Sequence, residues 1–119
     1  MRLLTLLLAL FSVGMAQPRI VTVDDLKAAL SNPKVFVIDV RTREEFAQGH
    51  IKGAVNWPVQ EIEGWWSRVP KDRAVYIHCN TQNRSAVAVQ YLINKGYRNL
   101  NLVHGGIQAW MARRYPITR

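Results

Sequence analysis

Cysteine and acidic residues are scarce in this chain. One Cys and three His cannot form an internal disulfide, nor can they supply the Cys₄ or Cys₂His₂ ligand set of a structural zinc site. Eight Asp and Glu stand against 16 Lys and Arg, so the net charge is +8. This charge suits anionic ligands, acidic partners and nucleic acid alike. The basic residues are scattered, however, and no basic run alternates with aromatic residues, so we do not expect nucleic-acid binding.

Long apolar runs are also absent, except at the N-terminus. A positive residue precedes the apolar stretch 3–11, and a short segment with small residues follows and ends at Ala16. This order is typical of a secretory signal peptide, and the stretch is shorter than the roughly 20 residues of a membrane span. We therefore expect residues 1–16 to be a signal peptide and residues 17–119 to be the exported domain. The expected location is the bacterial periplasm, with membrane contact only through the transient signal. The alternatives are an uncleaved anchor and a buried first helix.

The rest of the chain alternates between strand and helix patterns. Its composition is ordinary for a globular protein, with 49% hydrophobic and 20% charged residues over the whole chain, and its length suits a single domain. Short, mostly apolar runs suit parallel strands that are covered on both faces. Such runs occupy residues 35–38, 75–77 and 100–103, with weaker candidates at 20–21 and 54–55.

Helices are predicted between these runs. Thr22 and Thr42 each stand three residues before an acidic residue, as in a capping box. Gly49 and Gly96 follow helical patterns and are suited to end them. The predicted helices cover residues 22–30, 42–48, 60–69, 84–95 and 107–113. The sequence therefore predicts a single α/β domain with a mostly parallel central sheet.

The one cysteine lies where ligands usually bind in such sheets, beyond the carboxyl end of a strand. Cys79 follows the strand pattern 75–77 and precedes four polar residues that lead to the next helix. A loop of this kind turns backbone N–H groups inward, and together with the helix dipole they stabilise an anion. Arg84 adds a positive charge, and Ser85 can cap the helix or donate to an anion. A thiol in this place should ionise readily and react; the alternative is a buried structural cysteine.

Four segments resemble the motifs of the rhodanese-like sulfurtransferases, in the same order and spacing. Residues 79–85 (Cys-Asn-Thr-Gln-Asn-Arg-Ser) are similar to the family's active-site loop, Cys-x-x-Gly-x-Arg-Ser. The others are 38–46 (an acidic-Val-Arg segment), 49–58 (Gly-His-Ile-x-Gly-Ala-x-Asn-x-Pro) and 105–110 (Gly-Gly-x-x-x-Trp). Together they cover nearly all of the domain. One position differs, because Gln82 stands where the family has glycine, and this bears on the loop shape, the donor specificity and the rate.

The resemblance implies a single rhodanese-like domain, with a mostly parallel five-stranded sheet flanked by helices, and an enzyme of the thiosulfate sulfurtransferase type. In the implied reaction, the Cys79 thiolate takes the outer sulfur of a small anionic donor such as thiosulfate and becomes a persulfide. A thiophilic acceptor (cyanide, a thiol or a partner protein) then removes that sulfur. The implied substrate-binding residues, whose N–H groups would surround the sulfur, are Asn80, Thr81, Gln82, Asn83, Arg84 and Ser85. The chemistry calls for no metal and no organic cofactor.

Other interpretations of the thiol and its neighbours stay open. Asp39 and Arg41, at the end of a predicted strand, could support the loop, although an internal ion pair at the sheet edge is favoured. His78, next to Cys79, is not expected to act as a general base. The alternative functions are a non-catalytic persulfide carrier, a redox-sensing module and, less favoured, a Cys-dependent phosphatase or arsenate reductase. The last group uses a Cys-x₅-Arg loop, whereas four residues separate Cys79 from Arg84.

Overall fold

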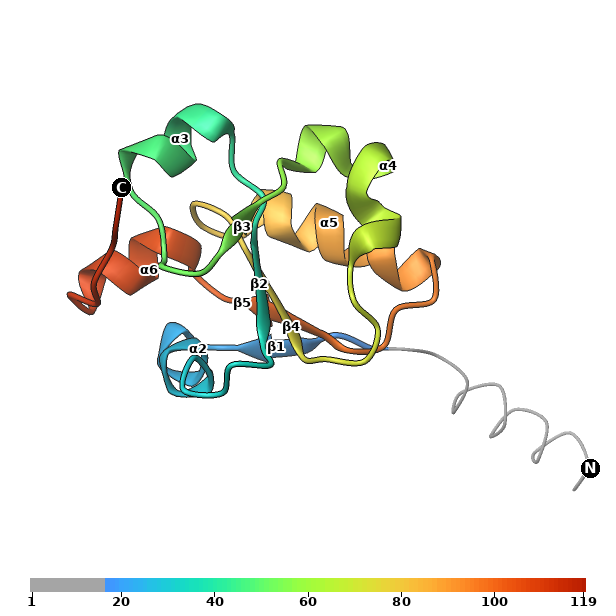
Figure 1. Ribbon diagram of the computed structural model, residues 1–119, viewed down its shortest axis with the longest axis horizontal. Helices are drawn as coiled ribbons and strands as arrows, with labels where there is room; N and C mark the ends of the chain where they lie inside the picture. Colours follow the sequence, from blue (N-terminus) through green and yellow to red (C-terminus); the bar gives the residue numbers. More distant parts are fainter. Residues whose placement is uncertain (1–16) are drawn as a thin grey trace, which may run out of the picture.

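The fold is a five-stranded parallel sheet with helices on both faces (Figure 1). The computed structural model describes residues 17–119, and the predicted signal peptide lies outside the described residues. The strands are ordered β1-β5-β4-β2-β3, and every adjacent pair is parallel. Their bounds are β1 Arg19–Val21, β2 Phe36–Asp39, β3 Val55–Asn56, β4 Val75–His78 and β5 Leu100–Val103. The predicted α/β architecture with five parallel strands is confirmed.

The helices begin largely where the capping signals place them. They are α2 (Val23–Ala29), α3 (Arg43–Gln48), α4 (Ile62–Trp65), α5 (Asn83–Asn94) and α6 (Gly106–Ala112). Thr22 and Thr42 accept N–H bonds from Asp25 and Glu45, whose carboxylates bond back to the threonine N–H groups. Both predicted capping boxes therefore form, and each fixes the point at which the chain turns from a strand or loop into a helix.

The prediction of one helix over residues 60–69 is wrong. The four-residue α4 lies between two 3₁₀ turns, η1 (Val59–Glu61) and η2 (Trp66–Arg68). The N-terminus of α4 has no side-chain cap. Side chains instead bond to carbonyls on either side of it, since Trp65 Nε1 donates to the Pro58 oxygen and Tyr97 Oη to the Trp66 oxygen, each at 2.8 Å. These hydrogen bonds from buried side chains therefore determine the shape of the segment more than a helical periodicity does.

The two faces of the sheet carry separate apolar clusters. α4 and α5 lie on one side of the sheet, and α2 and α6 lie on the other (Figure 1). Cys79 belongs to the cluster on the α5 face, with Val89 and Leu92 of that helix. Leu26 of α2 and Trp110 of α6 belong to the cluster on the opposite face. The loop after β4 is thus placed between the helices of the two faces. Within residues 17–119, no helix is long and apolar enough to cross a membrane.

Candidate functional site

The thiol of Cys79 is buried at the start of the loop between β4 and α5. Cys79 is 1% exposed, and its Sγ lies 3.3 Å from Ser85 Oγ and 3.4 Å from the Ser85 backbone nitrogen, which donates to it. Ser85 Oγ also donates to the Gln82 carbonyl at 3.0 Å, which fixes the hydroxyl in place. Ser85 lies inside the first turn of α5, while Gln82 holds the N-cap position. Ser85 therefore does not cap the helix, and its polar groups face the sulfur.

The N-terminus of α6 holds the loop from the other side. The N–H groups of Ile107 and Gln108 donate to the carbonyls of Cys79 (2.9 Å) and Asn80 (3.1 Å), and the Gln108 amide donates to Asn80 Oδ1 at 3.0 Å. Because a trans peptide is planar, its N–H points away from its own C=O. The N–H groups of Asn80 and Thr81 therefore point away from α6, toward the face of the sheet on which the thiol lies.

The loop contains a run of backbone donors. Within the described part of the chain, the N–H groups of residues 80–84 donate to no protein acceptor. Those of Asn83 and Arg84 are free because the first N–H groups of a helix have no intrahelical partner. Successive N–H groups of this kind form a concave site for an anion. The site therefore combines a thiol with donors that can stabilise negative charge on a sulfur atom.

Gln82 fits the loop without a glycine's conformational freedom. Its φ is −156°, which is outside the left-handed region where a side chain is strained. The side chain is half-buried, whereas those of Thr81 and Asn83 are exposed. The departure from the family's glycine therefore causes no left-handed strain here.

Arg84 links the loop to α3 through an ion pair. Its guanidinium makes two bonds to the Glu45 carboxylate, at 2.6 and 2.9 Å. Both side chains are 32% exposed. The hydrogen bonds from Arg84 are the largest cause that lowers the pKa of Glu45, to about 2. This geometry supports a role for Arg84 in holding the loop, since its charge is already paired with Glu45.

Replacing Glu45 by glutamine should reduce the acid sensitivity of the fold. A carboxyl whose pKa is lowered on folding, here from 4.5 to about 2, stabilises the fold fully above the unfolded-state value. That contribution is lost as the pH falls from about 5 to about 2. Since the pair is partly exposed, we expect about 1–2 kcal/mol. In urea titrations, Glu45→Gln should lose less unfolding free energy over this range than the wild type, and a Glu44→Gln control should match the wild type. Equal losses in all three proteins would contradict the prediction.

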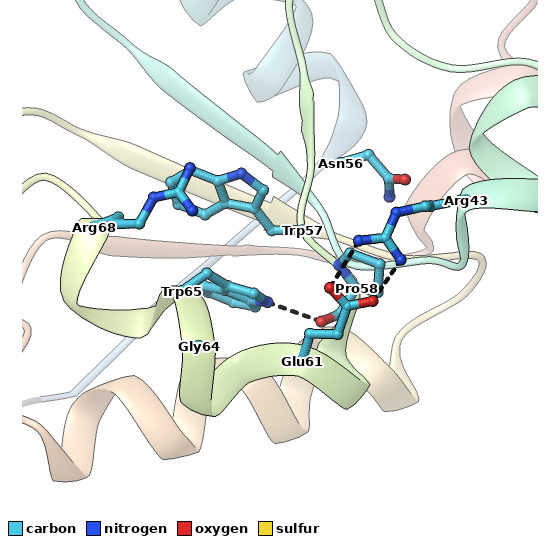
Figure 2. A pocket seen from close by; sticks show the side chains of 8 residues that line it. All are labelled: Arg43, Asn56, Trp57, Pro58, Glu61, Gly64, Trp65 and Arg68. Atoms are coloured by element: carbon cyan, nitrogen blue, oxygen red, sulfur yellow. Dashed lines mark hydrogen bonds and ion pairs between the residues drawn. The ribbon is translucent and has the colours of Figure 1, made fainter.

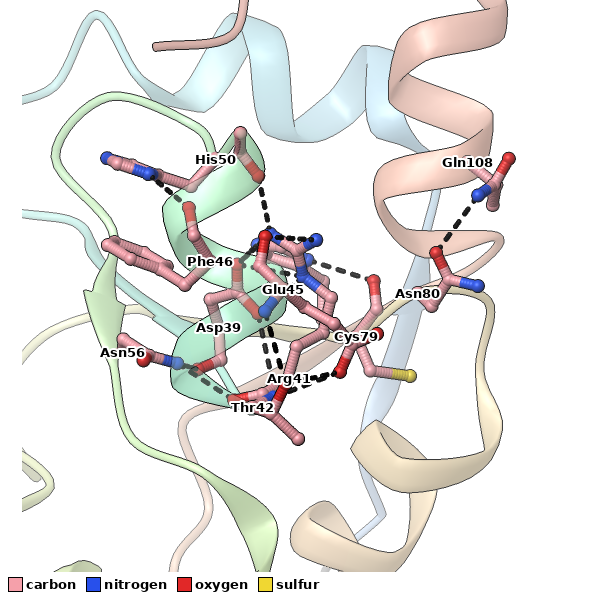
Figure 3. A network of polar contacts seen from close by, with 12 residues as sticks. Asp39, Arg41, Thr42, Glu45, Phe46, His50, Asn56, Cys79, Asn80 and Gln108 are labelled. Atoms are coloured by element: carbon pink, nitrogen blue, oxygen red, sulfur yellow. Dashed lines mark hydrogen bonds and ion pairs between the residues drawn. The ribbon is translucent and has the colours of Figure 1, made fainter. Parts of the chain in front are cut away.

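Asp39 and Arg41 form a buried ion pair behind the loop (Figure 3). Arg41 donates to both Asp39 oxygens through Nε and Nη2, and Nη2 also donates to the Gly49 carbonyl at 2.8 Å. Asn56 of β3 donates to the carbonyls of Asp39 and Arg41. Within the described residues, neither side chain of the pair bonds to residues 80–85. The pair joins the carboxyl end of β2 to the residue that follows α3, and Asn56 adds the end of β3.

A hollow lies beside β3, apart from the thiol (Figure 2). Trp57 and Trp65 form its wall, with ring centroids 5.5 Å apart. Arg68 lies over the Trp57 ring, and Arg43 pairs with Glu61 across the mouth. The positive groups that line it are thus already matched by a ring face or a carboxylate.

Sequence reasoning missed two residues that shape the loop. Glu45 was read only as part of a capping box, although its carboxylate also holds Arg84. Gly106 was read only as part of a motif, although a Cβ on it would lie 2.3 Å from the Cys79 carbonyl oxygen. The Gly-Gly pair at the start of the last helix was a visible signal of this close approach.

The fold and the site together define a parallel α/β domain with one thiol in a donor-lined loop between a strand and a helix. The model of the rhodanese-like domain family matches residues 22–113. The chain therefore belongs to the rhodanese-like domain family.

Named relatives and solved structures agree with this assignment. The chain is 41% identical over 83 residues to a protein of Allochromatium vinosum named sulfurtransferase, an alignment that covers 70% of this chain and 78% of the relative. It is 27% identical over 97 residues to the thiosulfate sulfurtransferase GlpE of Vibrio cholerae, covering 82% and 92% of the two chains. The crystal structure of a rhodanese-related protein from Thermoplasma volcanium superposes with a TM-score of 0.77 at 33% identity, covering 84% of this chain and 97% of that one.

Proposed function

We propose that the protein is a sulfurtransferase that carries sulfane sulfur on Cys79. The observation that carries the proposal is the set of donors around the thiol. The Ser85 N–H donates to Sγ at 3.4 Å, and within the described residues the N–H groups of 80–84, which precede it in the loop, have no protein acceptor. Donors fixed in advance around a developing negative charge stabilise it without reorganisation.

The proposed reaction has two half-reactions. The Cys79 thiolate attacks the outer sulfur of thiosulfate, a new S–S bond forms on Cys79, and the old S–S bond breaks with its electron pair leaving on sulfite. The terminal sulfur of the persulfide then carries the negative charge that the loop N–H groups can stabilise. Cyanide or a thiolate attacks that sulfur and leaves as thiocyanate or a new persulfide, while Cys79 returns as a thiolate. This is covalent catalysis with ping-pong kinetics.

Thiosulfate is the donor that we favour. A relative that this chain matches over 82% of its length is named a thiosulfate sulfurtransferase. The net charge of +8 favours the approach of an anionic donor. The side chains of Asn80 and Thr81 are at least partly exposed, so the loop that follows the buried thiol is in contact with solvent.

We also propose that residues 1–16 direct the domain to the periplasm; N-terminal sequencing of protein from a periplasmic extract tests this, and an intact Met1 would contradict it.

Intact mass spectrometry tests the proposed function. After incubation with thiosulfate, the reduced wild-type protein should gain one sulfur atom, and Cys79→Ser should gain none. Cyanide should reverse the gain and release thiocyanate in equal amount. A gain that neither cyanide nor a thiol reverses would point instead to a persulfide carrier. A folded, reduced protein that gains no sulfur from thiosulfate would contradict the proposed donor.

A further inference from the structure

His78 is a buried titratable residue that the proposed sulfur transfer does not use. It is the last residue of β4 and is fully buried. Its Nδ1 lies 3.2 Å from the Cys79 carbonyl oxygen. Its Nε2 has no hydrogen-bond partner within the described residues, and the nearest acidic oxygen, Asp39 Oδ2, is 3.8 Å away.

Packing alone does not explain a histidine at this position. A buried nitrogen without a partner destabilises the fold, and the neighbouring buried positions of β4 are filled by Val75 and Ile77. Asp39 cannot relieve Nε2 at hydrogen-bond distance, because its oxygens already accept from the Arg41 backbone and side chain. Among residues 17–119, the bond between Nδ1 and the Cys79 carbonyl is the one hydrogen bond that the ring makes.

The surroundings keep the ring neutral and fix its tautomer. Burial lowers the pKa of His78, and this effect outweighs the attraction of Asp39; Arg41 lowers the pKa further. These two side chains, from β2 and the residues after it, are the charged groups that act on the ring. On the face of the sheet opposite to the thiol, α6 contributes the apolar side chains of Ile107 and Trp110. A carbonyl oxygen only accepts, so the proton of the neutral ring must lie on Nδ1.

The Cys79 carbonyl thus accepts two bonds from two elements. Nδ1–H of His78 approaches it from β4, and the Ile107 N–H of α6 approaches it at 2.9 Å. Two donors on one oxygen restrict rotation of the peptide between Cys79 and Asn80. The Asn80 N–H is therefore held in the direction opposite to α6, on the thiol side of the loop.

We propose that His78 is a positioning residue for the loop that follows Cys79, and that its Nδ1–H sets the direction of the first N–H donor beside the thiol. The proposal rests on the proposed function in taking Cys79 as the nucleophile. His78 acts through the peptide and touches neither the donor nor the acceptor of sulfur. By fixing the direction of the Asn80 N–H, it favours the thiolate and the persulfide anion of Cys79.

Two variants of His78 with amide side chains of different length test this proposal. In His78→Asn, the amide nitrogen can take the place of Nδ1, whereas in His78→Gln it reaches toward the place of Nε2. His78→Leu removes both nitrogens. Cys79 is the only thiol of the chain, so the rate of its alkylation by iodoacetamide, measured against pH, reports on its ionisation alone.

We expect alkylation of His78→Gln and His78→Leu at neutral pH to be about fivefold slower than that of the wild type, as the loss of one hydrogen bond implies, with pH profiles displaced to higher pH. His78→Asn should stay within about twofold of the wild type. Thermal unfolding separates this role from a structural one, because His78→Leu should be at least as stable as the wild type.

The order of the alkylation rates among the variants decides whether the proposal holds. An asparagine variant no better than the glutamine variant, or a leucine variant with the wild-type profile, would overturn the proposal. If His78→Leu does not fold, the comparison of asparagine with glutamine still decides. If the alkylation profiles follow the expected order but neither the wild type nor any variant takes sulfur from thiosulfate, His78 positions the loop and the proposed donor is wrong.

Discussion

Asp39→Asn should destabilise the fold by about 3–5 kcal/mol, the usual cost of leaving one partner of a buried ion pair alone. The Asp39 carboxylate is fully buried, and Arg41 is 5% exposed. Asp39 accepts from Arg41 Nε at 3.0 and 3.1 Å, from Nη2 at 2.7 Å and from the backbone N–H at 3.0 Å. An amide of the same size keeps the packing but leaves the guanidinium charge in the protein interior without a counterion. Urea unfolding at neutral pH measures the loss.

Glu61→Gln is the matched control for this prediction. Arg43 and Glu61 also form a two-bond pair, but their side chains are 66% and 48% exposed. Water solvates an exposed charge that loses its partner, so little change in stability is expected. Adding Arg41→Met to Asp39→Asn should recover part of the loss, because no charge then stays buried. If Asp39→Asn and Glu61→Gln lose the same unfolding free energy, burial of the ion pair does not determine its contribution to stability.

The fold could be predicted because its signals are local. The apolar runs at 35–38, 75–77 and 100–103 coincide with β2, β4 and β5 to within a residue or so. Thr22 and Thr42 cap helices as the spacing of acidic residues indicates. The failure at residues 60–69 has a tertiary cause, since bonds from the indole of Trp65 and from distant Tyr97 shape that segment. Such contacts leave no periodic trace in the sequence.

The candidate site was predictable in position but not in detail. The order of strand, polar loop and helix placed Cys79 and Ser85 at one sheet edge, and the structure brings their side chains to 3.3 Å. The bond from Arg84 to Glu45 joins residues 39 positions apart, and nothing in the local pattern fixes such a partner. The same holds for the contact of α6 with the loop, which depends on how α6 packs across the sheet.

Gly106→Ala should slow the loading of Cys79 with sulfur about tenfold or more, because small displacements of a reacting group reduce rates strongly. A Cβ at this position would lie 2.3 Å from the Cys79 carbonyl oxygen and 2.7 Å from that of Asn80. Either the loop or the start of α6 must then move, which weakens the bonds from Ile107 and Gln108 that orient the loop peptides. The strain and the left-handed φ of 55° should together destabilise the fold by about 2–4 kcal/mol.

Gly53→Ala separates the close approach from the backbone strain. Gly53 also has a positive φ, of 89°, but a Cβ there would meet nothing within 4 Å. This variant should lose only about 1–2 kcal/mol, the cost of a left-handed side chain, and should load sulfur from thiosulfate at the wild-type rate. The loading rates are measured by intact mass at a temperature where both variants are folded. If Gly106→Ala and Gly53→Ala load at the same rate, contact with α6 does not set the geometry of the loop. If only Gly106→Ala is slow, the packing of the last helix against the loop is part of what makes the thiol reactive.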